Sequence, residues 1–74
     1  MEKKDEELIQ SLFEREPELK RHYDEHVDLE RRLAVYQQKV HLTTEEEIEK
    51  KRLQKLKLAG KDKIMEILAR YRPH

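Results

Sequence analysis

The sequence contains no cysteine, no tryptophan, one glycine and two prolines among its 74 residues. The absence of cysteine excludes disulfides, thiol catalysis and cysteine-based zinc sites. With Gly60 as the only glycine, glycine-rich phosphate loops are excluded as well. A chain of this length forms one domain at most, and below roughly 80 residues a core alone seldom supplies more than about 3–5 kcal/mol. We therefore expect residues 1–74 to form a single domain with a thin core.

The sequence also has no excess charge of either sign. Lys and Arg number 17 and Asp and Glu number 17, so no overall field favours DNA, an anionic membrane or an acidic substrate. No apolar run approaches the roughly 18–20 residues needed to cross a bilayer. The first residues lead into mixed charge instead of the apolar segment of a secretory signal. We expect a cytoplasmic protein that does not span a membrane.

The sequence predicts helical structure throughout, with interruptions at Pro17, at the stretch 41–44 and at Pro73. These interruptions predict a short helix over about residues 5–15 and two long helices over 17–40 and 44–71. Proline is favoured at the first position of a helix and disfavours helical geometry in the residue before it. Pro17 is therefore predicted to be a corner between the first two helices.

The second long helix has a clear start signal. Thr43 or Thr44 can accept a backbone N–H, and Glu46 or Glu47 three residues later completes a capping box.

Apolar side chains recur at heptad spacing in the first long helix and within a narrow arc in the second. We define the predicted hairpin seam as Leu19, His26, Leu29, Leu33, Tyr36, Leu53, Leu56, Ile64 and Ile67. At 1.5 Å per residue the two helices are rods of roughly 36 and 40 Å. Residues 1–40 carry 8 basic and 11 acidic side chains, a net charge of −3, whereas residues 41–74 carry 9 and 6, a net charge of +3. Matched lengths and opposite charges predict an all-α, antiparallel, coiled-coil-like two-helix hairpin with a short N-terminal helix.

Other apolar residues lie outside this seam. Leu8, Leu12 and Phe13 form a stripe on the short helix, and Leu58 and Met65 lie almost opposite the seam of the second long helix. A second apolar face indicates that this helix is covered twice, once by its hairpin partner and once by the N-terminal segment or another subunit. These five residues are the predicted interaction face, used for dimerisation into a helical bundle or for binding another helical protein.

Gly60 interrupts the second long helix at a cost of about 1 kcal/mol relative to alanine. Two interpretations are open: a close approach of another backbone, or a tolerated defect.

His22 and His26 are four residues apart, so both lie on one helical face and could share a transition metal ion. Two ligands do not complete a site, and His41 or His74 would add one only if the fold or a second subunit brought them close. The favoured interpretation is that both rings pack in the seam and bond to carboxylates. We expect no metal and no cofactor.

The stretch 50–63 holds seven basic residues and one acid, Asp62, and could bind nucleic-acid phosphates. It contains no aromatic residue for stacking, and its basic side chains spread around the helix. The favoured interpretation is a solvated face supported by pairs such as Glu46 with Lys50.

Catalysis has little support in the sequence. Carboxylates are abundant, but acid–base catalysis needs a pair held in a concave, desolvated pocket, and a two-helix hairpin has little room for one. Ser11 is the only serine. We expect no enzymatic activity.

The order of several motifs resembles the YdcH family of small bacterial proteins, a domain of unknown function built as a helical hairpin. Pro17 is followed two residues later by Leu19, and an aromatic residue, a histidine, a leucine and an acid then follow as Tyr23, His26, Leu29 and Glu30. The family pattern Lys-Leu-x-Leu-Lys-Asp-Glu-Ile is similar to Lys57-Leu58-Ala59-Gly60-Lys61-Asp62-Lys63-Ile64. This chain departs from the family at Gly60, at Lys63 and at Val27, where an asparagine is frequent.

The resemblance covers nearly the whole chain. It implies a helical hairpin in a bacterial cytoplasm and carries no activity with it. The expected function is a protein-interaction or structural module that acts by helix–helix packing, and the alternative is a nucleic-acid-associated protein that binds phosphates through residues 50–63.

Overall fold

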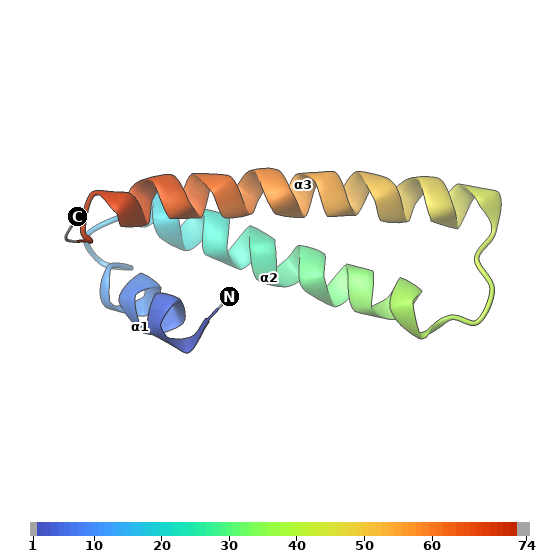
Figure 1. Cartoon of the computed structure of the whole chain (residues 1–74), viewed down its shortest axis with the longest axis horizontal. Helices are drawn as coiled ribbons and strands as arrows, with labels where there is room; N and C mark the ends of the chain where they lie inside the picture. The colour runs from blue at the N-terminus through green and yellow to red at the C-terminus, as the bar shows by residue number, and fades with distance from the viewer. Residues whose placement is uncertain (1, 73–74) are drawn as a thin grey trace.

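The computed structural model describes residues 2–72, which form three helices and no strand. The helices are α1 (Lys3–Ser11), α2 (Pro17–Gln38) and α3 (Thr44–Ala69). Helices α2 and α3 pack side by side and run antiparallel, and α1 lies at the end where α2 begins and α3 ends (Figure 1). The predicted all-α hairpin with a short N-terminal helix is confirmed. The predicted interruption at Pro73 lies outside the described residues, as does His74.

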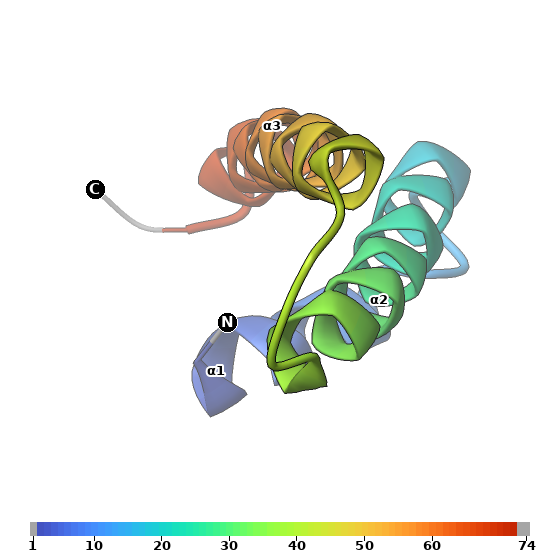
Figure 2. The same ribbon diagram turned by 90° about the vertical axis from the view of Figure 1, so that its right-hand side faces the viewer.

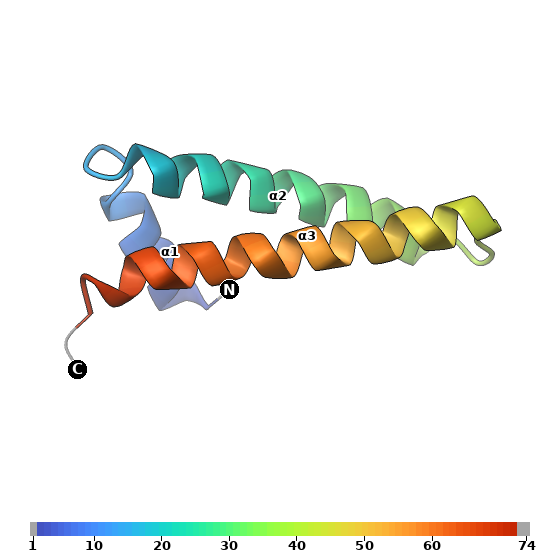
Figure 3. The same cartoon turned by 90° about the horizontal axis from the view of Figure 1, so that it is seen from above.

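The three helices occupy the corners of a triangle when they are viewed along the hairpin (Figure 2). Helix α1 therefore covers one side of the hairpin, and only near the termini, while α2 and α3 continue beyond it to the loop (Figure 3). The molecule measures 44 × 22 × 18 Å. Its elongated shape leaves most of the hairpin two helices thick.

The helix boundaries differ from the predicted ones most at the first helix, which spans Lys3–Ser11 instead of 5–15. The chain turns after Ser11, where the N–H of Leu12 bonds to the carbonyl of Ile9 at 3.1 Å. Glu16, the residue before Pro17, has φ −126° and ψ 84° and is not helical. Proline imposes this restriction on its neighbour, so Glu16 separates α2 from the turns that follow α1.

The long helices are slightly shorter than predicted. Helix α2 ends at Gln38 instead of 40 because Lys39 is already extended, with φ −78° and ψ 135°. Helix α3 ends at Ala69 instead of 71 and closes with the short-range bond from the N–H of Arg70 to the carbonyl of Ile67, which tightens the last turn.

Both predicted helix starts are confirmed. Pro17 opens α2, where its missing N–H is no loss. Thr43 caps α3: its hydroxyl accepts the N–H of Glu46 at 3.1 Å, and its own N–H donates to the Glu46 carboxylate at 3.0 Å. The capping box is complete.

The main core lies at the end of the hairpin that α1 covers. We define the terminal core as the buried residues Ile9, Leu12, Leu19, Ile64, Ile67 and Leu68. Beyond it, His26, Leu33 and Leu53 are the only other buried residues of the described chain, and they lie between α2 and α3. The hairpin therefore has a well-packed end and a thinly packed middle. None of the described helices is both long and apolar enough to cross a bilayer.

Candidate interaction groove

A groove of about 400 Å³ lies between α2 and α3 in the middle of the hairpin. Its floor is apolar, formed by Leu29 of α2 and by Leu56, Ala59 and Gly60 of α3. Its rims are polar. The rim residues are His22, Glu25, Asp28 and Lys63.

The groove opens on the side of the hairpin that α1 leaves uncovered. Tyr23 packs against the terminal core beneath α1, whereas Glu25 lines the groove. At 100° per residue these two side chains project about 160° apart around α2. On α3, Met65 packs toward α1 and Ala59 toward the groove, again on different sides. The hairpin thus has one covered and one free apolar side.

Gly60 lines the floor, and its missing side chain leaves that part of the groove hollow. A Cβ built at this position would meet no other atom within 4 Å, and its φ is not positive. Neither backbone strain nor a close approach from within the chain accounts for the glycine. Of the two interpretations left open by the sequence, a close approach by another backbone within residues 2–72 is therefore not found, and the hollow at Gly60 is a feature of the groove.

Charges of opposite sign face each other across the groove. Glu25 and Asp28 lie on the α2 rim and Lys63 lies on the α3 rim. Asp28 bonds to Arg32 at 3.2 Å and Lys63 lies 3.6 Å from Glu66, so both are partly neutralised along their own helices. Glu25 makes no ion pair with the described residues.

A second hollow of about 380 Å³ continues along the same side toward the loop. We call it the loop-end hollow; it is lined by Arg32, Val35, Tyr36, Lys39, Glu46, Glu49 and Leu53. Its charges are reversed relative to the groove, because the basic residues lie on α2 or directly after its end and the acidic ones lie on α3. It is also more polar than the groove.

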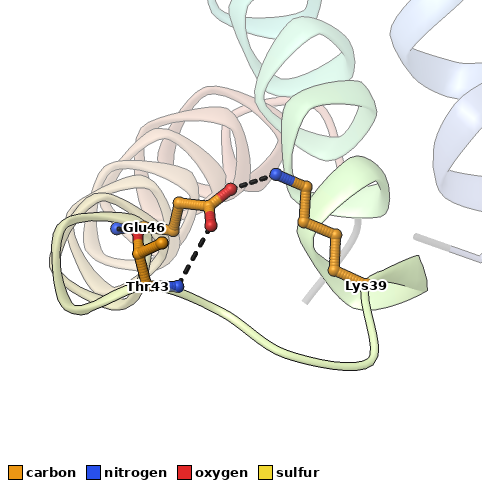
Figure 4. Close-up of polar contacts among 3 residues, drawn as sticks. All are labelled: Lys39, Thr43 and Glu46. Atoms are coloured by element: carbon orange, nitrogen blue, oxygen red, sulfur yellow. Dashed lines mark hydrogen bonds and ion pairs between the residues drawn. The ribbon is translucent and has the colours of Figure 1, made fainter.

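Glu46 ties the loop end together (Figure 4). Its carboxylate accepts two hydrogen bonds. One comes from the side chain of Lys39, just after α2, and the other from the N–H of Thr43. The bond with Lys39 is the main reason that the pKa of Glu46 lies below its usual value, and the Thr43 backbone adds to the shift. The expected pair of Glu46 with Lys50 is replaced by this contact, which crosses the hairpin.

The residues of the predicted seam divide between the hairpin interior and the groove. Six are buried: Leu19, His26, Leu33, Leu53, Ile64 and Ile67. Leu29 and Tyr36 are half-buried. Leu56 is 47% exposed and lines the groove floor instead of the seam, because α2 and α3 do not close over it.

The predicted interaction face is largely covered by the chain itself. Leu12 is buried in the terminal core with only 5% exposure, and Leu8, Phe13 and Met65 pack against that core. Contacts at the chain ends support this arrangement, because Asp5 pairs with Arg72 and the Tyr71 hydroxyl donates to Glu16. Leu58 stays 58% exposed and does not line the groove. Within the described residues, the groove is thus an apolar surface in addition to the exposed Leu58.

Several groove residues were not singled out from the sequence. Glu25, Asp28 and Ala59 belong to no motif, and their position depends on which side of the hairpin α1 covers. Gly60 was the one available signal, since a glycine inside a long helix calls for a reason.

The two histidines of α2 have different surroundings. His26 is only 5% exposed; its Nε2 lies 2.8 Å from Glu30, and its Nδ1 has no hydrogen-bond partner among the described residues. His22 is half-buried at the groove rim, and His41 is exposed in the loop. Within residues 2–72, no three His, Asp or Glu side chains come together as a metal-binding group.

The basic residues of the stretch 50–63 do not share one face of α3. Lys55 and Lys57, for example, project about 160° apart at 100° per residue. Arg52 is held by Glu49 at 2.7 Å, and this bond is the main reason that the pKa of Glu49 lies below its usual value.

No family model, curated protein or solved structure matches this chain.

Proposed function

We propose that this protein is a protein-interaction or structural module that acts by helix–helix packing, with the groove as its interaction site. The observation that carries the proposal is an apolar floor left open on the side of the hairpin that α1 does not cover. Leu56 stays 47% exposed there although it has helical spacing with buried Leu53 and Ile64. An apolar helix face laid into such a groove is a common mode of protein recognition.

Energetics support the same function. Burial of apolar surface stabilises by roughly 25 cal/mol per Å², and small domains without disulfides or metals commonly gain stability by association. The middle of this hairpin has three buried residues, His26, Leu33 and Leu53. A helix seated in the groove would add a third layer where the chain provides two.

Membership of the YdcH family and a cytoplasmic location are part of this proposal. The order of Pro17, His26 and Lys61-Asp62 supports the family, and the location is what that resemblance implies. We propose no enzymatic activity. The imidazole of His22 and the carboxylates of Glu25 and Asp28 line an open rim, whereas acid–base catalysis favours groups in a desolvated pocket.

Site-specific photo-crosslinking in the native cells tests the groove. A benzophenone amino acid at position 56 should give a covalent adduct with a polypeptide, and filling the groove with Gly60→Leu should abolish that adduct. The matched control is the same photo-crosslinker at position 58, which is similarly exposed on α3 but outside the groove. Equal adducts at positions 56 and 58, or none at position 56, would contradict the proposal.

The alternative proposal is phosphate binding by the basic stretch 50–63. Its support is the sevenfold excess of basic over acidic residues there. Titration of labelled duplex and single-stranded RNA at two salt concentrations separates the two functions, because binding through phosphates must weaken steeply with salt.

A further inference from the structure

We infer that the occupant of the groove is a second copy of this chain, placed by a two-fold axis parallel to the long axis of the hairpin. This inference depends on the proposed function, because it names the partner of the same groove. The axis lays α2 of each protomer over α3 of the other. Neighbouring helices are then all antiparallel, and the two hairpins form a four-helix bundle with α1 on each outer side.

The charge pattern of the groove favours this partner. Glu25 and Asp28 stand on the α2 rim and Lys63 on the α3 rim, so the groove is complementary to itself when α2 is laid over α3. Glu25 then faces the partner's Lys63, and the symmetry creates this contact twice. Glu25 lacks an ion pair with the described residues of its own chain and is therefore free to make one.

The loop-end hollow also has opposite charges on its two sides, but here the α2 side is basic and the α3 side is acidic. Arg32 lies on α2 and Lys39 directly after its end, and Glu46 and Glu49 lie on α3. Laying α2 over α3 again brings opposite charges together at that level. The whole uncovered side of the hairpin is thus self-complementary in one arrangement.

The apolar floor selects the direction of the axis. A two-fold axis perpendicular to the hairpin can place groove on groove only by laying α2 over α2, which brings the acidic rims together. Shifting that axis to pair opposite charges would place the apolar floor over the more polar loop-end hollow. With the axis along the hairpin, Leu29 and Leu56 of both copies meet in one layer, and the hollows at the two Gly60 positions face each other across the interface.

Sedimentation equilibrium of the purified full chain tests the inference. The parent should form a dimer, Leu56→Asp should be monomeric, and Leu58→Asp should remain dimeric. Both leucines are about half exposed on α3, so neither change buries a charge in the hairpin, and circular dichroism checks that both variants remain helical. A parent that stays monomeric up to about 1 mM, or a dimer that is lost in Leu58→Asp and kept in Leu56→Asp, would overturn the inference.

Charge exchange tests the geometry without changing the groove floor. Glu25→Lys and Lys63→Glu should each raise the dimer dissociation constant between about twofold and thirtyfold, because each breaks two exposed ion pairs. The double variant should return to within about twofold of the parent. Failure of this rescue would overturn the placement of α2 over α3.

The outcomes also separate this inference from the proposed function. A monomeric parent whose position 56 crosslinks to a different polypeptide in cells overturns the second copy and leaves the interaction module standing. A monomeric parent with no adduct at position 56 overturns both.

Discussion

Gly60→Ala should stabilise the protein by about 0.8–1.0 kcal/mol. Glycine in a helix interior is less favourable than alanine by this amount, because its backbone loses more conformational freedom on folding. Two structural costs can cancel such a gain: a positive φ or a clash with the new methyl group. Neither applies here, since φ is not positive and the added Cβ meets no atom within 4 Å. The full propensity difference should therefore appear in the free energy of unfolding.

Urea unfolding followed by circular dichroism measures this difference. The protein concentration should be low enough for the chain to be monomeric, so that association does not contribute to the midpoint. A gain of about 1 kcal/mol corresponds to a rise in Tm of roughly 4–8 °C for a domain of this size. Ala59→Gly is the matched control: it lies next in sequence, is exposed on the same helix and should lose about what Gly60→Ala gains.

One result would refute the reasoning. If Ala59→Gly loses about 1 kcal/mol while Gly60→Ala gains nothing in the monomer, α3 has a local requirement for glycine at position 60. The groove floor would then be shaped by backbone geometry and not by the missing side chain.

Three further perturbations test the cap, the hairpin interior and the contact between the chain ends. Thr43→Ala should cost about 1 kcal/mol in urea unfolding because it removes the cap of α3, whereas Thr44→Ala should cost little; equal losses would argue against the capping box. Leu33→Ala should cost about 2–5 kcal/mol because Leu33 is only 2% exposed, and Val35→Ala, at an exposed position on the same helix, should cost far less; similar losses would contradict the burial of Leu33. The hydrogen bond to Glu16 raises the pKa of Tyr71 above its unfolded value of 10.0. Its stabilising effect is therefore complete below pH 10 and lost as the pH rises through the folded-state pKa. The stability difference between the parent and Tyr71→Phe should shrink above pH 10, and a difference that stays constant from about pH 8 to pH 11 would count against this contact.

The elements of the fold could be predicted because the decisive signals are local. Pro17 is suited to the first position of a helix, and Thr43 with Glu46 satisfies free N–H groups of a helix start within four residues. The boundary of α1 was misplaced because residues 12–15 are as compatible with a helix as with the observed turns. The turn is decided by the burial of Leu12 in the terminal core.

The free surface could not be predicted because it depends on tertiary packing. Periodicity places Leu56 near Leu53 and Ile64 on one side of α3, but it does not say which edge of that side the neighbouring helix covers. Helix α1 packs beside Met65 and away from Leu56. Met65, expected on the interaction face, is therefore partly covered, whereas Leu56, expected in the seam, is exposed in the groove. The contact between Lys39 and Glu46 was missed for a related reason, since it crosses the turn of the hairpin and belongs to no helical spacing.

Helix α1 also indicates what a good occupant of the groove needs. It covers its own side of the hairpin with an apolar stripe that includes Leu8 and Ile9, and its Asp5 pairs with Arg72 just after α3. An apolar face with an acidic edge is therefore already the way in which one helix of this chain seals α3. In the proposed dimer, α2 of the partner has the same features: Leu29 reaches the groove floor and Glu25 reaches Lys63. The balanced charge of the chain fits this arrangement, because side chains of opposite sign lie on the α2 and α3 sides of both the groove and the loop-end hollow.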